Sequence, residues 1–155
     1  MVSSLAGDLS PLIDDFGLRI GRAMGWPPMA GRAAGVLMLS PEPMATAELQ
    51  SALDASKGSV SEITRLLVDS GTVRRFKEPG SRQYVYQWRD DAWIGCLQHV
   101  LEQTRELLTL AEHARARGDE LPEPQRGRLH EMHEYYTFMV RHIEAIFEEY
   151  RTLKS

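Results

Sequence analysis

The chemistry that this sequence suggests is anion binding by basic side chains clustered around one turn. Pro79-Gly80 favours a tight turn between two β-rich runs, so the side chains beside it must project. Cations on a projecting hairpin can contact phosphates or enter a DNA minor groove. The alternative is a solvated hairpin with incidental charge. The basic residues are Arg74, Arg75, Lys77 and Arg82.

A second set of polar side chains precedes the hairpin on a predicted helix. Apolar residues at helical spacing between 60 and 67 predict its buried face. Ser56 is the expected cap, and Ser59-x-x-Glu62 is an alternative start. Serine and lysine suit phosphates, and arginine suits guanine. The opposite face carries Lys57, Ser59, Ser61 and Arg65.

The helices and strands that must position these residues are predicted from the spacing of apolar residues and from the residues that break helices. Ser10 is expected to cap a first helix that the 25–28 segment ends, and Thr46 is expected to cap a short helix to about residue 55. A short turn then leads into the helix after Ser56, which is a helix-turn-helix arrangement. The other predicted elements are a helix over 28–39, strands over 72–76 and 83–88, and long helices over 92–116 and 123–152.

The expected fold class is mainly α with a small β-hairpin wing, that is, a winged helix-turn-helix plus a helical dimerisation module. Residues 28–89 form the predicted winged helix-turn-helix DNA-binding domain, and residues 90–155 the long-helix dimerisation module. Residues 1–27 are expected to supply an N-terminal helix that joins the dimerisation module. Two helices this long cannot bury their apolar stripes on a small domain, so a second copy is the simplest partner.

Charge and composition support this division. The 155-residue chain has a net charge of -4, but residues 46–89 hold seven Lys and Arg against five Asp and Glu. A local basic surface on an acidic chain fits a nucleic-acid partner. No apolar run approaches the roughly 20 residues of a membrane span, and a single cysteine excludes an internal disulfide. We expect a cytoplasmic, nucleoid-associated protein with no membrane partner.

Several of these motifs together resemble the MarR superfamily of bacterial transcription regulators. The resemblance covers about residues 10–150 and is strongest over 28–88. It is closest to the GbsR-type branch and to mycobacterial repressors of lipid-transporter operons. The motifs that carry it are Ala30-Gly31-Arg32, the run from Ser56 to Ser61, Gly71-Thr72-Val73-Arg74-Arg75 and Pro79-Gly80-Ser81-Arg82.

The resemblance implies a homodimer that binds a palindromic operator in double-stranded DNA, usually as a repressor released by a small ligand. Ser59, Ser61 and Arg65 match recognition-helix positions, and Arg82 matches the basic residue at the wing tip. The family commonly has an acidic residue, which orients this arginine, where Ser81 stands. Ser81 could supply only a weaker, neutral hydrogen bond.

The candidate effector site is apolar. The family resemblance places such a pocket where the dimer helices meet the DNA-binding lobe, and it suggests an apolar or amphipathic effector of unknown identity. Each residue alone could equally be ordinary core. The candidates are Trp26, Met29, Trp88, Trp93, Tyr136 and Met139.

Other reactive side chains give weaker indications. We expect Cys96 to be buried and inert, because a sensing thiol needs a nearby cation and solvent access. His130 and His133 share a helix face and could bind zinc, although such residues are usually solvated. No catalytic set, metal site or cofactor motif is predicted, so we do not expect an enzyme. The alternatives are a zinc-responsive regulator, or a helical ligand-binding or protein-interaction dimer without DNA binding.

Overall fold

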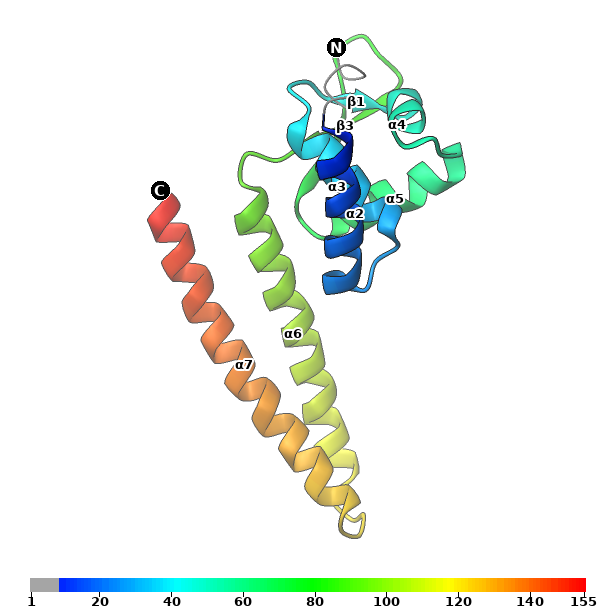
Figure 1. The fold of residues 1–155 in the computed structure, drawn as a ribbon. Helices are drawn as coiled ribbons and strands as arrows, with labels where there is room; N and C mark the ends of the chain where they lie inside the picture. The colour runs from blue at the N-terminus through cyan, green and yellow to red at the C-terminus, as the bar shows by residue number, and fades with distance from the viewer. Residues whose placement is uncertain (1–8) are drawn as a thin grey trace. The chain divides into compact units, whose positions relative to one another are not determined.

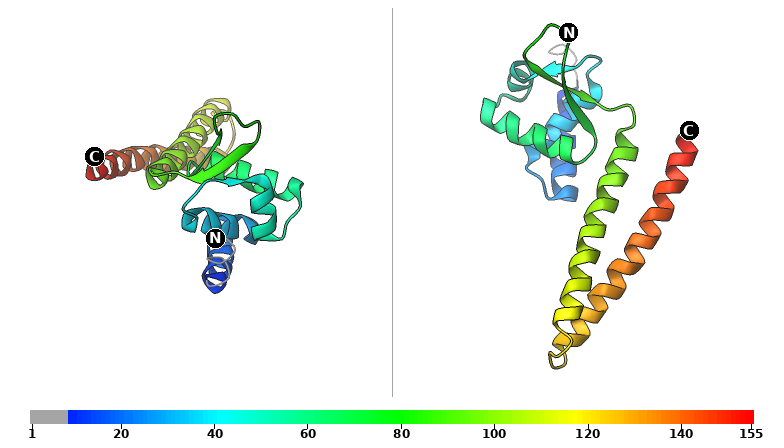
Figure 2. Two further views of the ribbon diagram at one scale, coloured as in Figure 1. Left: turned by 90° about the horizontal axis from the view of Figure 1, so that it is seen from above. Right: turned by 180° about the vertical axis from the view of Figure 1, so that it is seen from behind.

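The computed structural model describes residues 9–155, and the chain divides into two compact units at Ala92 (Figures 1 and 2). The first unit ends with Ala92, and the second is Trp93–Ser155. The division falls close to the predicted boundary between 28–89 and 90–155, and the roles predicted for those segments remain predictions. The first residues of the predicted segment 1–27 lie outside the described part of the chain.

Helices α2 (Ser10–Met24) and α3 (Pro28–Leu39) approach each other closely. A Cβ atom added at Gly31 would lie 2.6 Å from the backbone oxygen of Phe16 and 2.9 Å from the Cα of Gly17. Only residues without side chains permit this packing. Within this chain, α2 therefore packs on α3 in the first unit. Its predicted role in a dimerisation module concerns contacts with a second chain and stays a prediction.

Helix α3 lies at the centre of the first hydrophobic core. Its small and apolar side chains are buried, as its composition predicts, and the helix spans the predicted 28–39. The same core takes in side chains from every other element of the unit, which fixes the helix after Ser56 and the sheet to α3. Its members from those elements include Leu49, Leu53, Val60, Ile63, Leu67, Val73 and Tyr86.

The helix-turn-helix consists of α4 (Thr46–Leu53) and α5 (Lys57–Asp69). The predicted Ser56 cap is confirmed, because its Oγ accepts a hydrogen bond of 3.1 Å from the Ser59 amide. Two other predicted caps are wrong. Thr46 and Ser10 are each the first helical residue of their helix, and neither occupies the cap position. At α4 the Glu48 carboxylate instead accepts from the Ala45 amide at 3.2 Å.

The sheet has three antiparallel strands in the order β1-β3-β2. Strands β2 (Val73–Lys77) and β3 (Tyr84–Trp88) form the predicted hairpin, with Lys77 opposite Tyr84. Strand β1 (Met44–Ala45) was not predicted, because two residues carry no alternation. It pairs with Val85 and Tyr86, so β3 is the central strand. The mainly helical fold class with a small β-wing is confirmed.

The second unit is an antiparallel helical hairpin of α6 (Ala92–Arg117) and α7 (Gln125–Lys154). Its core contains Leu101, Val140 and Ile143, and Arg105 forms an ion pair of 3.0 Å with Glu144. The two helices diverge away from their connecting turn (Figures 1 and 2). Among residues 9–155, no helix combines the length and apolar character needed to cross a membrane.

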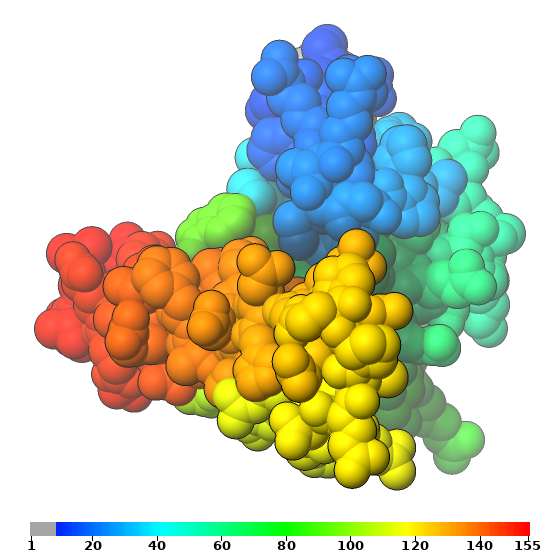
Figure 3. All heavy atoms as spheres, turned by 90° about the horizontal axis from the view of Figure 1, so that it is seen from below, coloured from blue at the N-terminus to red at the C-terminus, as the bar shows by residue number. Residues whose placement is uncertain are grey.

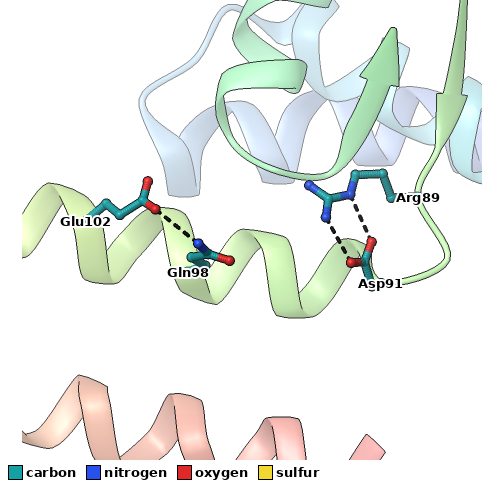
Figure 4. Close-up of polar contacts among 4 residues, drawn as sticks. All are labelled: Arg89, Asp91, Gln98 and Glu102. Carbon is teal, nitrogen blue, oxygen red and sulfur yellow. Dashed lines mark hydrogen bonds and ion pairs between the residues drawn. The ribbon is translucent and has the colours of Figure 1, made fainter. Parts of the chain in front are cut away.

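A bidentate ion pair lies at the end of β3, immediately before α6. The Arg89 guanidinium donates to both carboxylate oxygens of Asp91 at 2.8 Å (Figure 4). The hydrogen bond from Arg89 lowers the pKa of the Asp91 carboxyl group. The Arg89 amide also donates to the Thr72 carbonyl at 2.9 Å, so this arginine is held to the start of the wing.

Candidate nucleic-acid interface

A groove of about 420 Å³ opens between the helix-turn-helix and the wing. Three of the predicted DNA-binding residues, Lys57, Ser61 and Arg75, line it together. They come from the first two turns of α5 and from the middle of β2. The fold thus brings residues from separate elements to one surface. The remaining lining residues are Thr46, Ala47, Gln50, Gln83, Tyr84 and Tyr86.

Strand alternation divides the basic residues of the wing between two faces. Arg75 and Lys77 share a face with Tyr84, and the Tyr84 ring centroid lies 3.9 Å from Arg75 Cζ and 4.6 Å from Lys77 Nζ. Arg74 lies on the opposite face, where its guanidinium donates to Gln87 Oε1 and stacks 4.1 Å from the centre of the Phe76 ring. The four wing bases that the sequence groups together therefore do not form one patch.

The exposed face of α5 carries the other predicted residues. Ser61 and Arg65 are exposed, together with the acidic Glu62. Ser59 is half-buried, and its Oγ accepts a hydrogen bond of 3.0 Å from Ser56 Oγ, so it belongs partly to the helix cap. Ser61 and Arg65 are consequently the more accessible of the three predicted recognition positions.

The wing tip is a tight turn with Gly80 at φ 81°. Ser81 takes part in the turn itself, because its Oγ accepts from the Gln83 amide at 3.1 Å and its amide donates to the Glu78 carbonyl at 3.1 Å. Arg82 follows in this exposed turn. The hydroxyl that replaces the family's usual carboxylate is thus engaged with the main chain.

The charges of the groove are not neutralised locally. Within the described residues, neither Lys57, Arg75 nor Lys77 forms an ion pair with an acidic side chain. Basic side chains beside hydroxyl and aromatic groups are suited to contact a sugar–phosphate strand. The surface can therefore bind a polyanion electrostatically.

Known proteins with similar sequences identify the family. The chain is 32% identical over 120 residues to the HTH-type transcriptional regulator MmpR5 of Mycobacterium tuberculosis, covering 77% of this chain and 67% of that protein. The chain belongs to the MarR family of transcription regulators. A family model described as MmpR5-like MarR family transcriptional regulator matches residues 91–153 of this MarR-family chain. Its relatives are transcription regulators and not enzymes, as the sequence predicts.

Two further similarities concern this MarR-family protein. It is 30% identical over 67 residues to the HTH-type transcriptional repressor OpcR of Bacillus subtilis, which covers 43% of this chain and 36% of that protein. A crystal structure of a transcriptional regulator is 25% identical and superimposes with a TM-score of 0.85, covering 94% of this chain and 99% of the other. The similarity thus includes both compact units.

The six residues predicted to line an effector pocket are distributed over both units of the regulator. Trp26, Met29 and Trp88 pack against the first core, and Met139 packs against the second. Tyr136 is half-buried and Trp93 is 55% exposed. A pocket formed by these side chains remains a prediction.

Cys96 and the histidines of α7 are the other sensing candidates of the MarR-family chain. Cys96 is half-buried, and burial raises the pKa of its thiol, which opposes formation of the reactive thiolate. The Nδ1 atom of His133 lies 3.2 Å from a guanidinium nitrogen of Arg115. Within residues 9–155, no group of three or more His, Cys, Asp or Glu side chains is placed to hold a metal ion.

Sequence reasoning missed the six other residues that line the groove, among them Thr46, Gln50 and Tyr84. Thr46 and Gln50 come from α4 and are brought to α5 and the wing only by tertiary packing, so no local pattern indicates them. Tyr84 could have been identified, because alternation along β3 and its position opposite Lys77 place its ring beside the basic residues.

Proposed function

We propose that this MarR-family regulator binds a palindromic DNA operator as a homodimer and represses transcription. In each lobe, α5 enters a major groove while the wing contacts the adjacent backbone or minor groove. The observation that supports this best is the groove in which Lys57 of α5 and Arg75 of β2 lie on the same surface, with no ion pair to an acidic side chain of residues 9–155. Acting on chromosomal DNA, the protein would work in the cytoplasm.

Exposed apolar side chains support the homodimer. In the second unit they include Leu110, Phe138 and Ile146, which are 53%, 52% and 52% exposed. Ile146 also lines a depression of about 450 Å³ near the end of α7. The later part of this helix is coloured orange to red in Figure 3. Helix α2 exposes Leu12 and Leu18, which fits its predicted place in the dimerisation module. A second chain would bury these surfaces.

A repressor role is supported by a relative, and release from DNA by an effector is supported by the coupling expected between effector binding and DNA binding. OpcR is a transcriptional repressor, and a repressor role is proposed here on that similarity. The two DNA-binding lobes of a dimer must be spaced so that each reaches one half of the palindromic operator. An apolar or amphipathic effector that binds best to a dimer with a different lobe spacing would weaken DNA binding by about 1–3 kcal/mol. The candidate residues for its site are Trp26, Met29, Trp88, Trp93, Tyr136 and Met139.

Binding to labelled promoter fragments tests the proposal directly. Fluorescence anisotropy over a range of salt concentrations should show a sequence preference and an affinity that falls steeply as salt rises. The double variant Lys57→Gln/Arg75→Gln should weaken binding to all fragments, whereas Arg117→Gln, an exposed charge at the end of α6, should not. Absence of sequence preference, or of salt dependence, would overturn DNA regulation in favour of a helical interaction dimer.

The oligomeric state is tested separately by sedimentation. The protein should have twice the mass of one chain, and Ile146→Glu should shift it toward the monomer because a buried charge is costly. A chain that remains monomeric at micromolar concentration would contradict the homodimer.

A further inference from the structure

One aromatic side chain of the wing lies against two basic residues of strand β2, of which Arg75 lines the groove. The centroid of the Tyr84 ring is 3.9 Å from Arg75 Cζ and 4.6 Å from Lys77 Nζ. Both distances are within the range of a favourable cation–π interaction. Tyr84 itself lines the groove between the helix-turn-helix and the wing.

The hydrophobic core does not explain this tyrosine. Tyr84 is 40% exposed, whereas the following residues Val85 and Tyr86 are 8% and 7% exposed and belong to the packed sheet. It lies at the last register position of the hairpin, opposite Lys77 and next to the turn. Tyr84 is not among the residues that pack against the first core, and its ring contacts both cations.

We propose that Tyr84 is a positioning residue for DNA binding, which holds Arg75 at the groove and Lys77 on the same face of the wing before DNA arrives. This inference rests on the proposed function. Arg75 and Lys77 are long side chains of equal charge on alternate positions of one strand, so in solution they would repel each other and sample many rotamers. The negative face of the Tyr84 ring attracts both, which reduces the entropy lost when they engage phosphates.

The test compares two substitutions at this position. Tyr84→Phe keeps the ring and should bind the labelled promoter fragment like the unmodified protein. Tyr84→Ile keeps a residue that suits a strand but removes the ring, and should bind about three- to fivefold more weakly, the effect of one or two exposed cation–π contacts. Thermal unfolding followed by circular dichroism should be the same for both variants.

A double-mutant cycle separates positioning from other roles. If Tyr84 acts through Arg75, then Tyr84→Ile should have a much smaller effect on affinity in an Arg75→Gln background. The corresponding cycle with Lys77→Gln gives an independent measurement, so the inference does not depend on one variant. If Tyr84→Ile reduced DNA affinity by the full amount in both the Arg75→Gln and the Lys77→Gln backgrounds, the positioning role would be overturned.

The remaining outcomes are equally decisive. If Tyr84→Phe binds as weakly as Tyr84→Ile, the hydroxyl contacts DNA and positioning by the ring is wrong. If the unmodified protein binds with a sequence preference but Tyr84→Ile loses nothing, only this inference fails. If the unmodified protein shows no salt-dependent binding, the proposed function itself fails.

Discussion

The Arg74 guanidinium donates two hydrogen bonds to Gln87 Oε1, from Nη2 at 2.8 Å and from Nε at 3.1 Å, on the face of the hairpin that does not carry Arg75. Arg74 is thereby held along the sheet surface and stacks on Phe76. Its neighbour Arg75 faces the groove beside Lys57 and Ser61. Adjacent arginines in the sequence therefore have different surroundings and should have different roles.

Replacing each of these arginines by glutamine should separate the roles. Arg75→Gln removes a charged contact to phosphate, so DNA affinity should fall by roughly 1.5–3 kcal/mol, and the slope of log affinity against log salt should decrease by about 0.9. Arg74→Gln changes the net charge equally but should alter both quantities much less. Anisotropy titrations at several salt concentrations measure this, and equal effects of the two substitutions would contradict the division of the wing into two faces.

Arg65 should contribute base recognition, because it is exposed on α5 with its guanidinium available to a guanine. Arg65→Ala should reduce the preference for one base pair in each half-site by about 1–3 kcal/mol. Lys57→Ala should weaken binding to all sequences alike, since a lysine at the helix start suits phosphate. Binding to a library of single-base operator variants distinguishes the two, and a uniform loss for Arg65→Ala would show that it reads no base.

Gly31 should tolerate no side chain. An alanine there would bring a methyl group to 2.6 Å from the Phe16 backbone oxygen, and this atom can move only if α2 moves. We expect Gly31→Ala to lower the free energy of unfolding by about 1–3 kcal/mol, as overpacking does. Gly58→Ala in α5 is the control, since the nearest atom is Ser56 Oγ at 4.0 Å, and it should stabilise the helix by up to about 1 kcal/mol. Urea unfolding of both variants measures the difference.

The ion pair of Arg89 and Asp91 should give a pH dependence. The folded protein lowers the pKa of Asp91, chiefly through the hydrogen bond from Arg89. A carboxyl group with a lowered pKa stabilises the fold fully above its ordinary pKa of about 4 and loses this contribution as pH falls through the folded value. Asp91→Asn should therefore flatten the acid side of the stability curve below about pH 4, and Asp90→Asn is the matched control. Thermal unfolding between pH 2 and 7 tests it; parallel curves for Asp91→Asn and the unmodified protein would contradict the prediction.

Much of the fold followed from local sequence. Pro28 and the run of small residues after it predict α3 with its observed ends. Ser56 was identified as a cap because a helical pattern begins directly after it. The caps predicted at Ser10 and Thr46 failed because either residue can also begin a helix when the preceding backbone turns into it.

The candidate site was only partly predictable. The basic hairpin and the polar face of α5 each follow from a short, continuous stretch of sequence, so both can be predicted from it. The groove also needs Thr46 and Gln50 from α4, whose place beside Arg75 depends on packing between elements distant in sequence. The separation of Arg74 from Arg75 follows from strand alternation, which grouping basic residues by their closeness in sequence does not take into account.

The short strand β1 determines where the wing can bend. It pairs with Val85 and Tyr86, so the base of the hairpin is fixed on both sides of β3. The pairing of β2 with β3 ends at Lys77 and Tyr84, and only residues 78–83 extend beyond it. Arg75 therefore lies within the paired part of the hairpin, whereas Arg82 lies in the turn beyond it. If the wing contacts DNA as proposed, we expect the Arg75 contact to stay constant between operators, and the turn with Arg82 to adjust to minor grooves of different width.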